Sequence, residues 1–305
     1  MKISLIIPIY NEEVLIRTLF ERCINSLKEI TDDYEIICVN DGSTDNSLRE
    51  LLECHKENPQ FKILVLSRNF GHQAAYTAGL SYAKGDYIVM MDGDMQDPPE
   101  LIPLMQEKLV KNNLDAVYGK RIERKETRTK RILIKIFHKI FRKFSRLTDA
   151  ENVGNFSIFN RKVLKAILLF KERKRYLPGL RFLVGFRQDY IEYTRPGREL
   201  GKSKMTFCKL FDLAMDAIYS FSDLPIKICL YLGLIGVITF FLGLFYSLVS
   251  KIIGIAPYGW SSIVLSIYFL GSVQLVFLGI IGEYVFRIYT ETQKRPLFIV
   301  DKFID

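Results

Sequence analysis

The sequence predicts a mostly parallel α/β domain followed by two membrane-spanning helices. In residues 1–119, short apolar runs alternate with polar segments of helical periodicity. Residues 228–250 and 260–282 are two charge-free runs of 23 residues each. Between these regions, residues 120–147 hold twelve Lys or Arg against two Glu, a net charge of +10 that exceeds the +9 of the whole chain. The basic excess is therefore local.

The α/β domain is predicted from the order of its elements. The expected strands are 3–9, 34–39, 62–66, 87–91 and 115–118. Segments with helical periodicity, such as 12–28 and 45–56, separate them. Because a repeated βα pattern gives a mostly parallel sheet, we expect residues 1–120 to form an α/β core and 121–224 the rest of the domain.

Composition excludes several classes of protein. A chain of 305 residues that is 49% hydrophobic and 25% charged is not a disordered polymer. Its five cysteines are odd in number and scattered without a C-x-x-C pair, which argues against a disulfide framework or a zinc site. We expect the N-terminus to stay in the cytosol, because Met1 and Lys2 run straight into a strand-like segment without a signal-peptide cleavage site.

Residues 225–290 are expected to form a transmembrane hairpin. A 23-residue helix at about 1.5 Å per residue spans a hydrocarbon core of about 30 Å, and the turn-like residues 254–259 separate the two runs. Basic residues flank the outer ends of the pair, whereas only Lys251 lies in the connection. The positive-inside rule then predicts a multi-pass protein of the inner (cytoplasmic) membrane, with the α/β domain, both termini and the tail 291–305 on the cytoplasmic side. The alternative is a pair of buried helices in a soluble protein.

The basic segment 131–147, RILIKIFHKIFRKFSRL, predicts an amphipathic helix on an anionic membrane surface. Its polar face carries four basic residues at helical spacing: Lys135, Lys139, Arg142 and Arg146. Residues 207–221 form a second, less basic candidate for an interfacial helix. The alternative is a basic helix packed on its own domain. We expect no nucleic-acid partner, since no recognition motif accompanies the charge.

Acidic residues follow several predicted strands. Ligands of parallel sheets bind beyond the carboxyl ends of the strands, where this chain places Glu12, Asp41, Asp92 and Asp94. Two carboxylates one residue apart, Asp92 and Asp94, can converge on a hard cation that leaves positions free for phosphate oxygens. An Asp-rich junction that only caps a helix is the alternative. Neither a P-loop nor a G-x-G-x-x-G fingerprint is present.

These residues carry a resemblance to a known family. IPIYNEE at 7–13, NDGSTD at 40–45, SRNFG at 67–71, AGL at 78–80 and DGDMQDPPE at 92–100 resemble family-two inverting glycosyltransferases, which have a GT-A type fold. RPGRELGKSK at 195–204, SFS at 220–222, GEY at 282–284 and the Arg-Pro at 295–296 resemble the polyprenyl-phosphate subgroup. The chain is most similar to the bactoprenol glucosyltransferase type, related to dolichol-phosphate mannose synthase. The resemblance covers essentially the whole chain.

The resemblance implies that the core 1–120 binds a nucleotide sugar, and it implies roles for individual residues. The positions that match the nucleoside and donor site are Pro8, Tyr10, Asn11, Glu12, Asp41 and Asp92. Those that match the ligands of a Mg or Mn ion on the diphosphate are Asp92, Asp94 and Gln96. The positions that match the binding of donor diphosphate and lipid phosphate are Arg121, Arg195, Arg198, Ser203 and Lys204. The planar guanidinium of arginine can donate two parallel hydrogen bonds to phosphate oxygens. The alternative for the last group is a solvated basic loop. The expected catalytic set is Asp94, Arg121, Arg198, Lys204 and Asn155.

One departure from the family pattern concerns residues 152–157, NVGNFS. Close relatives usually read Gly-Asp-Phe-Arg here, so Asn155 stands for a candidate catalytic carboxylate and Ser157 for an arginine. An alcohol acceptor would need a base, but a phosphate monoester, with a second pKa of about 6, is already mostly a dianion at neutral pH. Loss of the carboxylate is therefore compatible with catalysis, and position 155 instead affects binding or the choice of sugar.

The resemblance implies the transfer of a hexose from a nucleotide diphosphate sugar, with UDP-glucose the expected donor, to undecaprenyl (polyprenyl) phosphate in the bilayer. The alternatives are a different lipid acceptor, or a catalytically silent scaffold that binds nucleotide sugar and assists a lipid flippase. The protein partners considered are a second copy of the chain, as a homo-oligomer, and a flippase. The sugar, the final glycoconjugate and the preferred metal are left open by these motifs.

Overall fold

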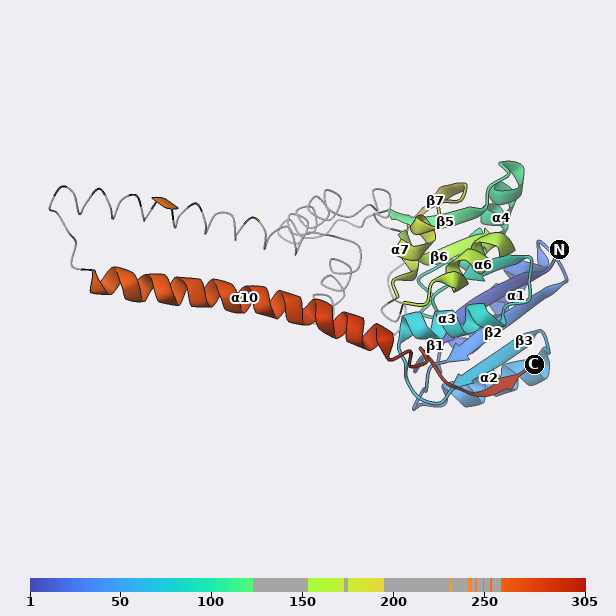
Figure 1. The fold of residues 1–305 in the computed structure, drawn as a ribbon. Coiled ribbons are helices and arrows are strands. Elements are labelled where there is room, and N and C mark those ends of the chain that lie inside the picture. Colours follow the sequence, from blue (N-terminus) through green and yellow to red (C-terminus); the bar gives the residue numbers. More distant parts are fainter. Residues whose placement is uncertain are drawn as a thin grey trace. The chain divides into compact units, whose positions relative to one another are not determined.

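The structure is a computed structural model that describes residues 1–122, 153–172, 175–194 and 259–305, with isolated residues between 231 and 253 (Figure 1). Contacts divide the chain into two units. The described part of the first unit comprises residues up to 194 and the segment 296–305, and that of the second consists mainly of the helix α10 (Trp260–Thr292). The predicted interfacial helices, 131–147 and 207–221, lie outside the described residues. The first predicted span, 228–250, is described only at isolated positions.

The first unit is built on one mixed sheet of eight strands in the order β7-β5-β6-β4-β1-β2-β3-β8 (Figure 1). The strands are β1 (Ile3–Ile9), β2 (Tyr34–Asn40), β3 (Phe61–Leu66), β4 (Tyr87–Met90), β5 (Ala116–Ile122), β6 (Val153–Asn160), β7 (Gln188–Thr194) and β8 (Val300–Ile304). β1 is parallel to β2 and β4, β2 to β3, and β5 to β7. Only β6 and β8 run antiparallel to their neighbours. The predicted, mostly parallel α/β sheet is confirmed.

Helices cover both faces of this sheet. They are α1 (Ile16–Lys28), α2 (Ser47–Glu57), α3 (His72–Tyr82), α4 (Ile102–Lys111), α6 (Arg161–Leu169) and α7 (Leu177–Leu183), with the 3-10 turn η1 (Pro99–Leu101) before α4. Alternate residues of a strand point to opposite faces. In β1, accordingly, Ile7 joins the core under α1, α2 and α4, whereas its neighbour Ile6 joins the core under α3, α6 and α7. Burial on both faces explains the continuous apolar run of β1.

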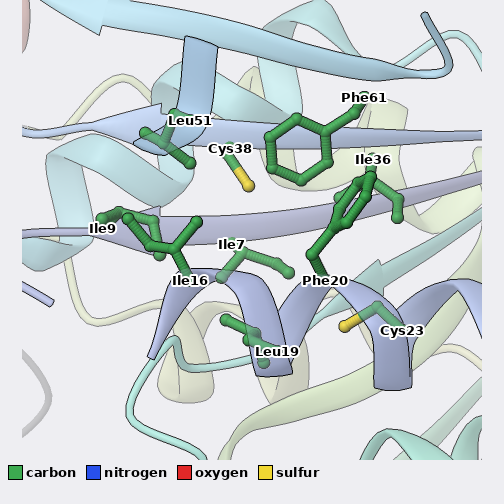
Figure 2. A pocket seen from close by; sticks show the side chains of 10 residues that line it. All are labelled: Ile7, Ile9, Ile16, Leu19, Phe20, Cys23, Ile36, Cys38, Leu51 and Phe61. Atoms are coloured by element: carbon green, nitrogen blue, oxygen red, sulfur yellow. The ribbon is translucent and has the colours of Figure 1, made fainter. Parts of the chain in front are cut away.

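A small apolar pocket lies between α1, α2 and strands β1 to β3 (Figure 2). Its lining residues are Ile7, Ile9, Ile16, Leu19, Phe20, Cys23, Ile36, Cys38, Leu51 and Phe61. Burial raises the pKa of both the Cys23 and the Cys38 thiols, which are free and unreactive in this setting. With no charged or amide side chain in its lining, the pocket belongs to the core and not to a ligand site.

The segment after α10 returns to the first unit. Residues 291–305, expected only as a tail, include β8, which pairs antiparallel with β3. The backbone N–H of Ser67 donates to the carbonyl oxygen of Ile299 over 3.0 Å. At the far end of β8, the carboxylate of Asp305 forms ion pairs with the ammonium groups of Lys62 and Lys84. This edge of the sheet is therefore completed by a distant part of the chain.

The second predicted span, 260–282, falls within α10. Within the described residues, no helix combines the length and the apolar character needed to cross a membrane. The predicted spanning hairpin is thus not shown by the structure.

Candidate active site

Two loops at the carboxyl ends of β1 and β2 are hydrogen-bonded to each other. Asn11 accepts from the backbone N–H of Thr44 through Oδ1, at 2.8 Å, and its own N–H donates to Ser43 Oγ at 3.1 Å. The N–H of Glu12 donates to Ser47 Oγ at 3.0 Å. Asn11 has a φ of 55°, a left-handed conformation that Asn tolerates better than most residues. Loop 10–13, which carries the predicted nucleoside ligands, is thereby fixed against loop 41–47.

Asp41 anchors a third loop. Its buried carboxylate accepts from the backbone N–H of Phe70 at 2.7 Å and of Gly71 at 3.0 Å. Burial raises the pKa of Asp41, although these two hydrogen bonds oppose the shift. The adjacent Gly42 has a φ of +66°, and a Cβ on it would lie 2.6 Å from the carbonyl carbon of Arg68. Asp41 therefore holds the loop after β3 in place, while its predicted contact with the nucleoside stays a prediction.

Asp92 is the centre of the site. Its Oδ1 accepts from Tyr76 Oη at 2.7 Å and from Asn155 Nδ2 at 3.4 Å, and lies 3.2 Å from His72 Nε2. A guanidinium nitrogen of Arg121 lies 3.7 Å from its Oδ2. Burial alone would raise the pKa of Asp92, but the contacts with His72, Tyr76 and Arg121 outweigh it and leave the pKa strongly lowered. Asp92 is therefore ionised at neutral pH.

The turn after β4 brings Asp94 beside Asp92. Gly93 is needed there because a Cβ would lie 2.9 Å from the carbonyl oxygen of Pro8. The N–H of Gln96 donates to Asp94 Oδ1 at 3.2 Å, and Met95, with a φ of 60°, turns its side chain into the core. A left-handed conformation at a non-glycine residue is typical of a functional turn.

Arg121 is held by a buried tyrosine and carboxylate. Tyr193 Oη donates to Asp97 Oδ1 at 2.6 Å and accepts from Arg121 Nε at 3.2 Å. A nitrogen of Arg121 lies 3.7 Å from the same carboxylate oxygen, and the other oxygen of Asp97 accepts from the N–H of Asp92 at 3.3 Å. A Cβ on Gly154 would clash with the guanidinium. Arg121, predicted after the fifth strand, in fact belongs to β5, and its cation lies between two carboxylates.

The structure brings together residues that the sequence did not predict for the site. They are His72, Tyr76, Asp97, Arg181 and Tyr193. Asp97 lies within the family motif, and the spacing of His72 and Tyr76 places them on one face of α3. No local signal points to Tyr193 or Arg181. Of the predicted residues, Arg195, Arg198, Ser203 and Lys204 lie outside the described part of the chain. β7 ends at Thr194, which pairs with Ile122, so the chain leaves β7 next to Arg121.

A divalent metal fits the carboxylates present. Carboxylate oxygens are the ligands preferred by Mg²⁺ and are common for Mn²⁺. Within the described residues, no group of three His, Cys, Asp or Glu side chains could hold a metal by itself. Asp92 and Asp94 would therefore supply a partial set of ligands, which suits an ion that is shared with the diphosphate of a bound nucleotide.

Comparison with known proteins identifies the family. Residues 4–168, more than half of the chain, match the glycosyl transferase family 2 model. The chain belongs to this family. A bactoprenol glucosyl transferase of Shigella phage SfII is 37% identical over 99% of this chain and 98% of its own length. A prophage bactoprenol glucosyl transferase homolog of Escherichia coli is 38% identical over 99% of each chain, and an uncharacterized glycosyltransferase of Synechocystis is 41% identical over 98% and 95%.

The family membership confirms the predicted enzyme class, a glycosyltransferase, and the GT-A type of the α/β fold. Among solved structures, mannosyl-3-phosphoglycerate synthase from Rubrobacter xylanophilus superimposes with a TM-score of 0.50 over 72% of each chain. At 14% identity this likeness concerns the fold alone. A glucosyl-3-phosphoglycerate synthase from Mycobacterium tuberculosis, crystallised with Mn²⁺ and UDP, has a TM-score of 0.47 and 18% identity over 71% of this chain and 77% of that one.

Proposed function

We propose that this family 2 glycosyltransferase transfers glucose from UDP-glucose to undecaprenyl phosphate. The observation that carries the proposal is the carboxylate of Asp92, two residues before Asp94 and 3.7 Å from the cation of Arg121, in a chain that matches a bactoprenol glucosyl transferase over nearly its full length. A metal held by carboxylates and a cationic side chain at the diphosphate both stabilise the charge that develops on the leaving group of a nucleotide diphosphate sugar.

The donor is assigned to the three linked loops. Tyr10, Asn11 and Glu12 lie on the loop that is tied to the one beginning at Asp41, and Pro8 lies near the carboxyl end of β1 just before it. This surface would hold the nucleoside. The diphosphate would lie at Asp92, Asp94 and Gln96, with a Mg or Mn ion. When bound there, the metal neutralises negative charge on the diphosphate.

The acceptor is assigned to the segment that leaves β7. In the sequence, Arg195 follows Thr194 directly, and Arg198, Ser203 and Lys204 come within the next ten residues. Thr194 is paired with the end of β5 that carries Arg121. Cationic side chains suit an acceptor that is itself a phosphate. The acceptor is a membrane lipid, so we assign the enzyme to the cytoplasmic face of the membrane. The apolar runs 228–250 and 260–282 and the basic segment 131–147 support that location.

The reaction needs no general base in this protein. An oxygen of the lipid phosphate attacks the anomeric carbon as the bond from that carbon to the nucleotide diphosphate breaks, and the electron pair leaves with the diphosphate. Because the attacking phosphate is already mostly a dianion, no proton has to be removed. Asn155, which donates to Asp92, serves to orient that carboxylate. Arg121 stabilises the charge on the leaving group.

The test is direct. Membranes that contain the full chain are incubated with radiolabelled UDP-glucose, undecaprenyl phosphate and Mn²⁺, and labelled lipid is extracted and counted. We expect labelled lipid from the wild type and none from Asp94→Asn. Labelled lipid only with another nucleotide sugar would refute the assigned donor. No labelled lipid with any donor would refute the enzyme assignment and favour the scaffold.

A further inference from the structure

A buried arginine on α7 reaches the end of β6. Arg181 is 1% exposed, and its guanidinium lies 4.8 Å above the ring of Tyr118. One terminal nitrogen donates to the carbonyl oxygen of Asn155 at 2.9 Å and to Ser157 Oγ, and the other donates to the carbonyl oxygen of Gly154. Its Nε has no partner in the described part of the chain. All of these acceptors are neutral.

Stability alone does not explain such a residue. A buried cation whose hydrogen-bond acceptors are all neutral has lost its hydration without gaining a contacting anion. Replacement of buried charged groups by apolar residues of similar size is often neutral or stabilising. The position of Arg181 therefore points to a role in the site that its acceptors belong to.

The N-terminal end of β6 is held by its neighbouring strands only in part, through the pair of Val153 with Lys120 of β5. β4 ends at Met90, which pairs with Ser157, so residues 153–156 extend beyond the last pair with β4. The register between β5 and β6 shifts over the same stretch. The guanidinium fork donates to two carbonyls within it. This is also the stretch from which the side chain of Asn155 reaches Asp92.

We propose that Arg181 is a positioning residue of the active site, which fixes the end of β6 so that Asn155 keeps Asp92 in its metal-binding orientation. The inference rests on the proposed function, because it takes Asp92 as a ligand of the metal. Arg181 acts through Asn155 and touches neither the substrate nor the metal. Without it, the end of β6 is free to shift and the bond from Asn155 to Asp92 is lost. The carboxylate of Asp92 is then oriented only by Tyr76, His72 and Arg121.

The chain offers a matched control. Arg161, at the start of α6, also donates to two backbone carbonyls, those of Ala83 at 2.9 Å and Gly85 at 2.8 Å. These acceptors precede the N-terminal end of β4, whereas Asp92 follows its C-terminal end. Arg161 thus makes similar hydrogen bonds but lies away from the site. The Arg161→Met variant measures the effect of losing an arginine with a purely structural role.

The experiment compares Arg181→Met, Arg161→Met and wild type in the purified full chain. Isothermal titration measures the affinity for Mn²⁺ in the presence of saturating UDP, and steady-state kinetics separate kcat from KM for the donor. We expect Arg181→Met to bind Mn²⁺ at least about tenfold more weakly and to lose kcat at least as much, with little change in the donor KM measured at saturating Mn²⁺. Arg161→Met should stay within about twofold of wild type in both, even where its Tm falls.

A second variant keeps the test decisive if Arg181→Met does not fold. Arg181→Lys retains the charge, but a single ammonium lacks the fork that spans the three oxygens. We expect it also to weaken Mn²⁺ binding beyond the Arg161→Met control. If the Arg181 variants that fold bind Mn²⁺ as tightly as Arg161→Met does, the inference is overturned and the proposed function is left intact. A wild type that binds no UDP with Mn²⁺ would overturn both.

Discussion

Asn155→Asp tests whether the acceptor phosphate needs a base. In the structure, the amide nitrogen of Asn155 donates to Asp92 Oδ1 over 3.4 Å in a site where Asn155 is 8% exposed. The substitution replaces this donor with a carboxylate oxygen. Two unit charges at this distance repel each other by about 5 kcal/mol at an effective dielectric constant of about 20. The cations of Arg121 and Arg181 offset part of this energy.

The expected result is a slower enzyme. The new carboxylate restores the residue expected from the family pattern, but it disturbs Asp92 and supplies a base that a dianionic acceptor does not need. Two adjacent carboxyls, Asp92 and the new Asp at position 155, would share a proton at pH values well above the ordinary pKa of aspartate. The pKa of the added carboxyl is therefore raised in the folded state. A raised pKa makes the variant progressively less stable than wild type as pH rises above about 4, until the folded-state pKa is passed.

The assay is the single-turnover rate at saturating undecaprenyl phosphate, measured with the Tm at pH 6 and pH 8. We expect Asn155→Asp to be no faster than wild type and to have a larger deficit in Tm at pH 8. Asn155→Ala, which removes the hydrogen bond without adding charge, is the control, and its deficit in Tm should not depend on pH. A gain in rate of about a hundredfold or more, as a general base supplies, would refute the reasoning.

Three further predictions concern the metal, the membrane and a buried carboxylate. Asp94→Asn should abolish turnover while the circular dichroism spectrum is unchanged, and wild-type turnover in excess EDTA would contradict this. Charge reversal of the basic face of segment 131–147 should lower the fraction of protein that sediments with anionic vesicles and raise the KM for the lipid, with unchanged nucleotide affinity. A KM equal to that of wild type would count against docking on the membrane. The residues reversed are Lys135, Lys139, Arg142 and Arg146. Burial alone would raise the pKa of Glu35, but hydrogen bonds from Ser4 and Lys84 and the ammonium of Lys62 leave it lowered. The ionised carboxylate of Glu35 therefore stabilises the fold above about pH 4.3, and this contribution is lost as pH falls. The difference in Tm between wild type and Glu35→Gln should narrow from pH 7 to pH 3, and a constant difference would contradict this.

The elements that the sequence predicted are those with a strong local pattern. β1 to β5 are apolar runs flanked by turns or helices, and all five are present in the sheet, with ends shifted by up to four residues. β6, β7 and β8 were not predicted. β8 contains Asp301 and Lys302 and is only partly buried, so its strand conformation depends on pairing with β3 and not on local periodicity.

Prediction of the site residues was limited in the same way, because only those with a local sequence pattern were found. Asp92, Asp94 and Asp41 were predicted because they follow strands whose carboxyl ends meet at one edge of the sheet. Tyr193 lies 96 residues beyond its partner Asp97, and only the packing of β7 brings the two together. Arg181 likewise reaches the carbonyl of Asn155 only through the packing of α7. Such contacts leave no trace in spacing along the chain.

The position of β8 also bears on how the protein is made. Lys84 and Asp305, which form an ion pair, are 221 residues apart, and the whole of α10 lies between them. During synthesis, β3 emerges from the ribosome long before its partner exists, so its edge stays unpaired until α10 has been translated. Such a long-range closure is slow, and an open edge can pair wrongly in the meantime. The N-terminal residues of the first unit therefore cannot complete its sheet without β8. Folding of this unit finishes only after the second unit has been synthesised.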